Sequence, residues 1–341
     1  MTKLDHSRQD LRVPDPCHFQ RDQPAMSRDI SCILADWGTT NLRAWAFAGD
    51  GAVIDHRGQG GGLLAVKDGR FAESFAAFCG DWLDARRPIP AVLSGMVGSK
   101  LGWKEAPYLT APVALADIGG QLCFVDDIPG ASVWIVPGVH LDDPAQPEVM
   151  RGEEAQILGA LAMLGRDGGV FLLPGTHAKW AIVEAGRLIA FRTYMTGEIY
   201  GLLRGGGTIG QLIEGEARDP AAFRRGVERS RSPDAANLLH SLFSVRTLGL
   251  LGGLPRSGLA SYLSGLLIGA ELKDGARWLE GRGLEHSLTL IGSPEMIEAY
   301  GAAAELCSLG QTSLESSAIL PGALFAIARA AGLVANPAGR P

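Results

Sequence analysis

The residues best suited to chemistry lie near the start of the sequence, where an apolar run ends in an acid. Residues 33–35 are apolar and lead into Asp36, and a turn of mostly small residues, WGTTN at 37–41, follows. After the turn, the large side chains of Arg43, Trp45 and Phe47 alternate with those of Leu42, Ala44 and Ala46. This alternation is the period of a β-strand, so the segment 33–47 is expected to form strand, turn and strand. A bare turn of this kind is also compatible with an ordinary hairpin.

An acid at the end of a buried strand needs a partner for its charge. Hydrated Mg²⁺ suits Asp36 because magnesium prefers one or two carboxylates together with phosphate oxygens. The glycine of the turn lets a ligand approach the backbone closely, and successive N–H groups in such a turn form a concavity that binds anions. We therefore expect Asp36 to hold the metal through water, and we expect a first phosphate clamp at Gly38, Thr39, Thr40 and Asn41.

A second strand, turn and strand occur in the other half of the chain. The apolar residues 170–173 precede PGTHAK at 174–179, and another apolar run follows. We expect a second phosphate clamp at Gly175 and Thr176, which His177 and Lys179 would assist, although a lysine after a turn is more often solvated. Two such clamps suggest two similar domains that face one nucleotide.

Two adjacent acids start a predicted helix just before the second clamp. The sequence RGEE at 151–154 precedes apolar residues 157, 158, 161 and 164, which have helical spacing. Glu153 and Glu154 therefore fall in the first turn of this helix. Acids are favoured there by the helix dipole alone, so their position does not require a chemical role.

Five motifs in order resemble the 2-dehydro-3-deoxygalactonokinase family. They are DWGTTNLR, GMVGSKxGWxEAPYL, RGEExQILGAL, LPGTHAKW and TYMTGE, and they spread over residues 31–333. More distantly, the chain is similar to the superfamily of sugar kinases, heat-shock chaperone ATPases and actin. The resemblance implies an α/β fold with two similar domains of the actin-like ATPase (ribonuclease H-like) type and a nucleotide cleft between them. It also implies that ATP, with Mg²⁺, phosphorylates the 6-hydroxyl of 2-dehydro-3-deoxy-D-galactonate, a small-molecule sugar acid, in galactonate catabolism.

The resemblance also implies roles for particular residues. In the superfamily an Asp after a glycine, at the start of a helix before the second clamp, is the catalytic base. Gly152 and Glu153 resemble that pair with Glu in place of Asp, and the departure leaves the choice open between Glu153 and Glu154. Gly292 and Ser293, at a strand end beside a helix N-terminus, resemble the adenosine-binding turn.

The loop at 95–108 is the expected site of the acceptor, because loops at the ends of buried strands carry function in α/β folds. A surface loop with an anchoring tryptophan is the alternative. Other arginines could also bind a carboxylate through both of its oxygens. The loop candidates are Ser99, Lys100, Trp103 and Tyr108, and the further arginines are Arg43, Arg192 and Arg246.

The bulk composition bounds the class of protein. The chain has 341 residues, enough for two domains of ordinary size. Its net charge is −6 and no basic stripe is visible, which argues against a nucleic-acid partner. Five cysteines without C-x-x-C spacing favour a reducing compartment over a zinc site or disulfides. No signal peptide or membrane span is visible, so we expect a cytoplasmic protein, and a homo-oligomer is compatible with the sequence.

Strand and helix patterns alternate along the chain, which indicates the α/β class. We expect a disordered leader at 1–28, within which Met26 could be the natural start, and a loose tail at 335–341. Between them we expect an N-terminal ATPase-like domain with the acceptor loop at 30–149 and a C-terminal one with the adenosine site at 150–334. Helices are expected at 71–83, 234–243, 257–272, 294–306 and 320–333.

Two other functions are compatible with the motifs. One is a phosphohydrolase of the same superfamily that cleaves polyphosphate or a nucleotide, and the acceptor loop and the GEE motif argue against it. The other is an actin-like or chaperone-like nucleotide switch. Such switches carry long insertions for their partners, whereas this chain is compact.

Overall fold

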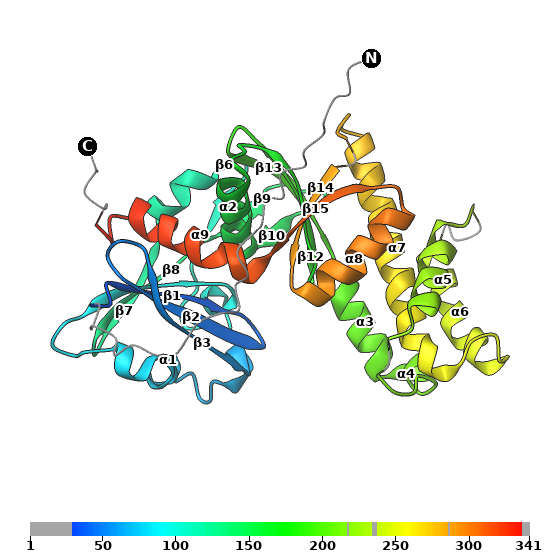
Figure 1. Ribbon diagram of the computed structural model, residues 1–341, viewed down its shortest axis with the longest axis horizontal. Helices are drawn as coiled ribbons and strands as arrows, with labels where there is room; N and C mark the ends of the chain where they lie inside the picture. Colours follow the sequence, from blue (N-terminus) through cyan, green and yellow to red (C-terminus); the bar gives the residue numbers. More distant parts are fainter. Residues whose placement is uncertain (1–28, 217, 234–236, 286, 336–341) are drawn as a thin grey trace, which may run out of the picture.

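The computed structural model describes residues 29–216, 218–233, 237–285 and 287–335. Within them the chain forms two six-stranded sheets, one three-stranded sheet and a set of helices (Figure 1). The expected leader at 1–28 and all but the first residue of the expected tail lie outside the described residues.

The first six-stranded sheet has the order β3-β2-β1-β4-β8-β7. Its first three strands are antiparallel and follow each other along the chain, whereas β4 and β8 run parallel to β1. The strands are β1 (Cys32–Trp37), β2 (Asn41–Phe47), β3 (Val53–Gly60), β4 (Ile89–Ser94), β7 (Cys123–Ile128) and β8 (Ala131–Ile135).

The second six-stranded sheet repeats this plan in the order β15-β14-β11-β12-β13-β6. Again three consecutive strands are antiparallel, and two later strands run parallel to the first of them. The repeat confirms the prediction of two similar units. The strands are β6 (Val113–Ala114), β11 (Gly169–Leu173), β12 (Ala178–Glu184), β13 (Arg187–Tyr194), β14 (Ser287–Gly292) and β15 (Gly310–Glu315).

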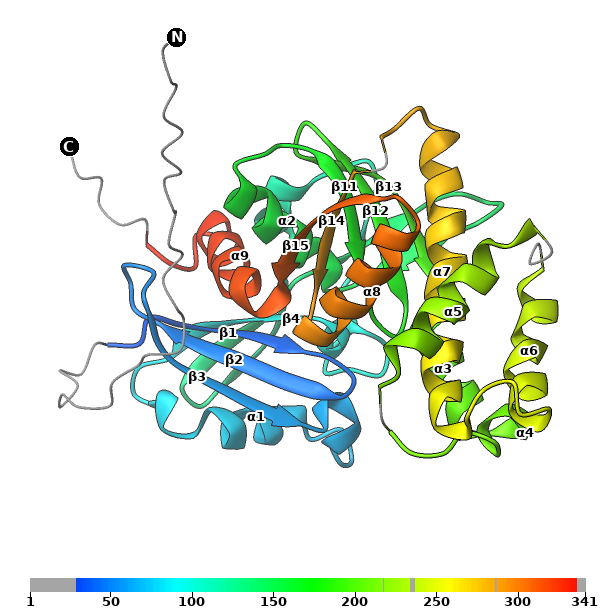
Figure 2. The ribbon, with the colours of Figure 1, turned by 45° about the vertical axis from the view of Figure 1, so that its right-hand side comes forward.

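Two helices lie between the sheets, α2 (Glu153–Leu164) and α9 (Ser316–Ala330) (Figures 1 and 2). One apolar cluster joins them to the facing sides of both sheets, including Leu34 of β1 and Phe171 of β11. The helix α9 comes from the end of the chain, yet it contacts β1 and β4 of the first sheet. This shared core holds α2 between the two sheets, so the strand ends of both sheets lie near this helix.

The outer faces of the two sheets have separate cores. The helix α1 (Phe71–Cys79) covers the first sheet, and α7 (Leu259–Glu280) and α8 (Pro294–Leu306) cover the second. Beyond α7 lies a helical group made of α3 (Thr196–Gly205), α4 (Gly207–Gly210), α5 (Pro220–Arg231) and α6 (Leu238–Leu250), which shares a fourth apolar cluster with α7. None of the described helices is long and apolar enough to cross a membrane.

Several elements were missed by sequence patterning. The small sheet β10-β9-β5 consists of short strands, namely β5 (Tyr108–Thr110), β9 (Gly138–Leu141) and β10 (Glu148–Met150). The strand β15 is half exposed and carries few apolar residues, so its pattern resembles a loop.

The helix expected at 234–243 corresponds to α6, which starts at Leu238, and residues 234–236 lie outside the described part.

Candidate active site

Asp36 is the second-to-last residue of β1 and lies on the side of the first sheet that faces α2 and α9. Along β1, Cys32 and Leu34 belong to the core between the sheets, and alternation places Asp36 in the same row. Its side chain is 20% exposed, and Arg43 Nη2 donates to Oδ2 over 2.7 Å. The other oxygen, Oδ1, accepts no hydrogen bond within the described part of the chain, so it is available to a hydrated cation.

The turn after Asp36 is held in place by a later segment of the chain. Gly38 N–H donates to the Asn41 carbonyl over 2.9 Å, and Leu63 N–H donates to the Gly38 carbonyl over 3.0 Å. Gly62 has a φ of +43°, and a Cβ there would lie 2.4 Å from the Gly38 oxygen. The close contact needs glycine, and it leaves Thr39 and Thr40 exposed at the tip of the turn.

Two glycines bring the start of α2 close to Asp36. Gly95 follows β4, and a Cβ there would lie 3.1 Å from Asp36 Oδ1. Gly152 precedes α2, and a Cβ there would lie 3.3 Å from the Gly95 Cα atom. Both have positive φ, +93° and +107° respectively, which favours glycine. Three segments far apart in the sequence therefore stack so that the acids of α2 begin beside the end of β1.

The two acids of α2 have different surroundings. The Glu153 side chain is 21% exposed, and its Oε2 accepts the Arg151 N–H over 2.9 Å. Glu154 is fully buried, and both of its oxygens lie within 2.9 Å of the Gly152 nitrogen, which donates to them. Burial, with Glu153 nearby, raises the pKa of Glu154 to about 8. Of the two acids, only Glu153 is exposed to solvent.

Lys179 is buried, so the expectation of a solvated lysine was wrong. It is 4% exposed on β12, on the face that also carries Ala181 and looks toward α2. Its Nζ lies 3.4 Å from Glu153 Oε1 and donates to the His177 carbonyl over 3.2 Å. The lysine therefore links the second clamp to Glu153.

The second clamp, Gly175 and Thr176, is fixed by the start of α3. Glu198 N–H donates to the Thr176 carbonyl over 3.0 Å, and a Cβ on Gly197 would lie 2.3 Å from the Gly175 oxygen. His177 Nε2 is 2.6 Å from Glu198 Oε2 at the surface. The motif TYMTGE therefore packs against the backbone of the clamp. A side chain on Gly175 itself would point into open space.

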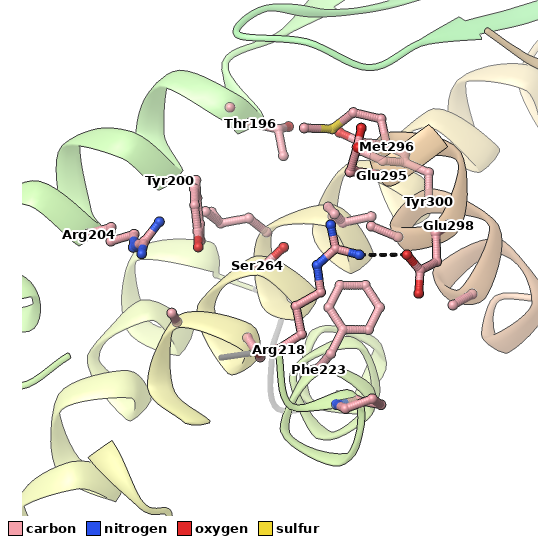
Figure 3. A pocket seen from close by; sticks show the side chains of 18 of the residues that line it. Thr196, Tyr200, Arg204, Arg218, Phe223, Ser264, Glu295, Met296, Glu298 and Tyr300 are labelled. Atoms are coloured by element: carbon pink, nitrogen blue, oxygen red, sulfur yellow. Dashed lines mark hydrogen bonds and ion pairs between the residues drawn. The ribbon is translucent and has the colours of Figure 1, made fainter. Parts of the chain in front are cut away.

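A pocket of about 380 Å³ opens beside the second clamp (Figure 3). Its walls come from Gly175 and from α3, α5, α7 and α8, and labelled residues such as Tyr200, Phe223 and Met296 surround it. Its volume and its mixture of apolar and polar walls suit a ligand of nucleoside size.

The expected adenosine turn lies next to this pocket. A Cβ on Gly292 would lie 3.8 Å from Pro174, which precedes the second clamp. Ser293 is the N-cap of α8, and its hydroxyl accepts the Met296 N–H over 3.4 Å. Gly292 therefore lies beside the residue that precedes the second clamp, and of Gly175, Thr176, Gly292 and Ser293 only Gly175 lines the pocket itself.

The four residues expected to bind the acceptor do not all lie together. Trp103 packs edge-on against Trp37 with ring centroids 6.4 Å apart and also stacks on Phe71, so it anchors the loop to the outer core. Lys100 is exposed, and the buried Ser99 hydroxyl has no hydrogen-bond partner within the described residues. Tyr108 is 38% exposed and contacts Arg151.

Sequence reasoning missed Arg151, although the residue is part of the RGEE motif. It is 8% exposed, its Nη2 donates to the Ala106 carbonyl over 2.8 Å, and its Cζ lies 4.3 Å from the Tyr108 ring centroid. Its Nε and Nη1 atoms have no partner among the described residues. Arg151 therefore connects the acceptor loop to the segment that leads into α2.

The other arginines considered for a carboxylate lie elsewhere. Arg43 is engaged by Asp36, Arg192 by Asp274, and Arg246 donates to the Thr208 carbonyl in the helical group. Among the described residues, neither Arg192 nor Arg246 forms a hydrogen bond or ion pair with the loop at 95–108.

A buried carboxylate behind the second clamp was also missed, and no local pattern announces it. Glu271 on α7 is 4% exposed and accepts hydrogen bonds from Trp180 Nε1, Thr196 Oγ1 and the Tyr300 hydroxyl. Burial raises its pKa. It joins β12, α3 and α8, the three elements that carry or flank the clamp and the pocket.

Comparisons with known proteins identify the family of the chain. A model of the 2-keto-3-deoxy-galactonokinase family matches residues 36–327. The 2-dehydro-3-deoxygalactonokinase of Escherichia coli (strain K12) is 35% identical over 298 residues, which cover 87% of this chain and 97% of that protein. A protein of Rhizobium meliloti (strain 1021) named as a probable 2-dehydro-3-deoxygalactonokinase is 34% identical over 306 residues, 86% of this chain and 95% of that protein.

A solved structure is also similar over nearly its whole length. The crystal structure from Sinorhizobium meliloti, described as a candidate 2-dehydro-3-deoxygalactonokinase, has a TM-score of 0.81 at 32% identity. The match covers 90% of this chain and 99% of that chain. The matched residues include both clamps and the acids of α2, and the chain therefore belongs to the 2-keto-3-deoxy-galactonokinase family and is a phosphotransferase.

Proposed function

We propose that this protein transfers the γ-phosphoryl group of ATP to the 6-hydroxyl of 2-dehydro-3-deoxy-D-galactonate. Its relatives carry the name 2-dehydro-3-deoxygalactonokinase, which supports a sugar acid of this kind as the acceptor. The observation that carries the proposal is Glu153, a partly exposed acid that forms an ion pair with Lys179 and follows Gly152, which packs against the Gly95 backbone beside Asp36. Phosphoryl transfer needs such positioning, together with charge stabilisation and a group that accepts the hydroxyl proton.

The residues present fit a nucleotide. In this proposal the nucleoside lies in the pocket bounded by α3, α5, α7 and α8, with its phosphates at Gly175 and Thr176 and at the turn 38–41. Asp36, whose Oδ1 accepts no hydrogen bond from the described residues, would hold Mg²⁺ through water. When bound, the metal neutralises charge on the phosphate oxygens.

In the proposed transfer step, Glu153 accepts the proton of the acceptor hydroxyl. The acceptor 6-oxygen bonds to the γ-phosphorus while the bond from that phosphorus to the β–γ bridging oxygen breaks. The hydroxyl proton passes to the Glu153 carboxylate, and the bond electrons stay with the ADP formed. Glu154 is excluded from this role by its complete burial, so Glu153 is the base we propose.

A coupled assay for ADP tests the proposal. It compares ATP consumption with 2-dehydro-3-deoxy-D-galactonate, with its stereoisomers at C4 and C5, and without any acid. We expect ADP release only with an acid, and the panel identifies the preferred stereochemistry. Equal ADP release without any acid would instead indicate a phosphohydrolase, and no release in either case would contradict both functions.

We also propose a reducing, cytoplasmic setting. The described cysteines, Cys32, Cys79, Cys123 and Cys307, are all free thiols. Burial raises the pKa of Cys32 and of Cys79 to about 12, which keeps both thiols protonated and unreactive. Thiol titration of the unfolded protein, isolated without reductant, should find these cysteines reduced, and disulfide-linked material would contradict the proposal.

A further inference from the structure

The ammonium group of Lys179 is a buried charge with an incomplete set of partners. An ammonium has three N–H donors. Within the described residues Lys179 Nζ donates one hydrogen bond, to the His177 carbonyl, and forms an ion pair with Glu153 at 3.4 Å. At least one donor is therefore left for a further acceptor, although the residue is 4% exposed.

A second unused donor stands beside it. Thr193 on β13 is the direct cross-strand partner of Lys179, so the two side chains share one face of the sheet. The Thr193 hydroxyl is buried and has no hydrogen-bond partner among the described residues. Unpartnered buried donors are uncommon in folded proteins, and each one calls for an explanation.

The location of Lys179 suggests what the missing acceptor is. On one side its ammonium binds the second clamp through the His177 carbonyl, and on the other side it meets Glu153, the base proposed above. In phosphoryl transfer the migrating group passes between the nucleotide at the clamp and the acceptor oxygen at the base. Lys179 contacts a group on each side of that path, and a phosphate oxygen is a strong acceptor for its remaining donor.

A structural ion pair alone explains the arrangement poorly. A buried pair is often no more stabilising than apolar residues of similar volume, and Lys179 lies in a strand whose neighbours are apolar core residues. A cation held rigidly at a water-poor site is, however, well suited to stabilise charge that develops in a transition state.

We propose that Lys179 is a catalytic residue whose ammonium donates to an equatorial oxygen of the migrating phosphoryl group, more strongly in the transition state than in the bound nucleotide. The inference rests on the proposed kinase function. It assigns Lys179 a contact of its own with phosphate, beyond any effect that the lysine has through Glu153. No bond forms or breaks at the lysine, so its charge is the same before and after transfer.

Binding of a transition-state mimic tests the proposal without turnover. ADP with aluminium fluoride and the sugar acid imitates the migrating group, whereas ADP alone does not. Calorimetry would compare Glu153→Gln with the double variant Glu153→Gln/Lys179→Met, so that the Glu153 carboxylate is absent from both proteins and they differ only in the lysine. We expect the double variant to bind ADP as Glu153→Gln does, but to bind the mimic roughly 100-fold more weakly. Lys67→Met, at an exposed position, is the control for loss of a lysine.

The outcomes separate this inference from the proposed function. Equal affinity of both Glu153→Gln proteins for the mimic would show that Lys179 acts only through Glu153 and would overturn the inference. Weaker binding of ADP and of the mimic by the same factor would mean a general binding role and would overturn it as well. If the wild-type protein neither binds the mimic nor phosphorylates the acid, the kinase function itself fails. Thermal unfolding of every variant confirms that the proteins compared are folded.

Discussion

At the scale of single residues, Glu153 and Glu154 show how one helix turn separates two identical side chains. Successive residues of an α-helix point about 100° apart, so at the N-terminus of α2 one acid faces the strand ends and the other the core. Glu153 meets Lys179 and remains partly exposed, whereas Glu154 closes back onto the Gly152 nitrogen. The same residue type is thus partly exposed beside a lysine at one position and buried against the backbone at the next.

The first prediction distinguishes these two roles. Glu153→Gln should lower kcat by roughly 100-fold or more while the affinity for ATP changes little, because a base acts on the acceptor proton. Glu154→Gln should retain most of the activity, because an amide oxygen can still accept from Gly152. Steady-state kinetics with both substrates varied gives the answer, and the opposite ranking would move the base to Glu154.

The second prediction concerns the stability of the protein as a function of pH. The pKa of Glu154 rises from 4.5 to about 8 on folding, so between these values the unfolded chain loses this proton while the folded chain keeps it. The contribution of Glu154 is therefore fully present below pH 4.5 and is lost as the pH rises to about 8.

Glu154→Gln removes this dependence. Its free energy of unfolding relative to wild type should increase with pH over that window, by roughly a few kcal/mol in total. Urea unfolding of both proteins at several pH values measures the difference, and the same substitution at exposed Glu184 is the control. A difference that stays constant with pH would show that Glu154 ionises normally in the folded protein.

At the scale of elements, the two phosphate clamps depend on glycines that belong to other segments. Gly62 supports the first clamp, and Gly197 at the start of α3 supports the second, each through a contact that leaves no room for a Cβ. The turns themselves can therefore remain open to a ligand. Glycines outside the two clamps therefore matter as much as the glycines within them.

The third prediction compares two glycines of α3. A Cβ on Gly197 would lie 2.3 Å from the Gly175 oxygen, whereas nothing lies within 4 Å of a Cβ on Gly201. Gly197→Ala should destabilise the protein by roughly 1–3 kcal/mol and raise the KM for ATP, because the second clamp must shift. Gly201→Ala should leave the KM unchanged and stabilise the helix slightly. Thermal unfolding and kinetics on both proteins test this, and equal behaviour would contradict it.

The fourth prediction concerns the acceptor loop, which Arg151 ties to the start of α2. Arg151→Met keeps much of the volume but removes the hydrogen bond to the Ala106 carbonyl. The KM for the sugar acid should rise on the order of tenfold, about 1.4 kcal/mol, while the KM for ATP stays nearly constant. Arg246→Met, in the helical group, is the matched control. Parallel increases in both KM values would mean a global effect instead of a loop effect.

At the scale of the whole molecule, two similar units meet through α2 and α9. The first unit supplies Asp36 and the turn 38–41, and the second supplies Gly175, Lys179 and the pocket. Each unit thus holds only part of the proposed nucleotide site. Closure of the units would exclude water and align the acceptor with the γ-phosphate.

The fifth prediction follows from this division. A non-hydrolysable ATP analogue together with the sugar acid should compact the protein more than either ligand alone, and small-angle X-ray scattering measures the change in radius of gyration. Gly175→Val should reduce the compaction, because its side chain would project into the open space where the phosphates must approach. Identical scattering with and without both ligands at saturation would indicate a rigid, preformed site.

The sequence by itself determined what depends on neighbours along the chain. Strand, turn and strand around Asp36 and Gly175 were predicted because alternation and turn chemistry are local, and α8 was predicted at its observed bounds because Pro294 opens a clear helical pattern. The order of the motifs was enough to predict the family and two similar units.

Only the tertiary structure decided which of these residues meet. It showed that Glu153 and Glu154 have different surroundings and that Lys179 is buried against Glu153, which lies 26 positions earlier. It also showed that Trp103 packs in the outer core and that Arg151 and Glu271 hold neighbouring segments together. These outcomes depend on contacts between segments that are remote in the sequence, such as Gly95 against Gly152. Local periodicity states which face of an element is apolar, but the environment of a charge is set by whatever the opposite element brings to it.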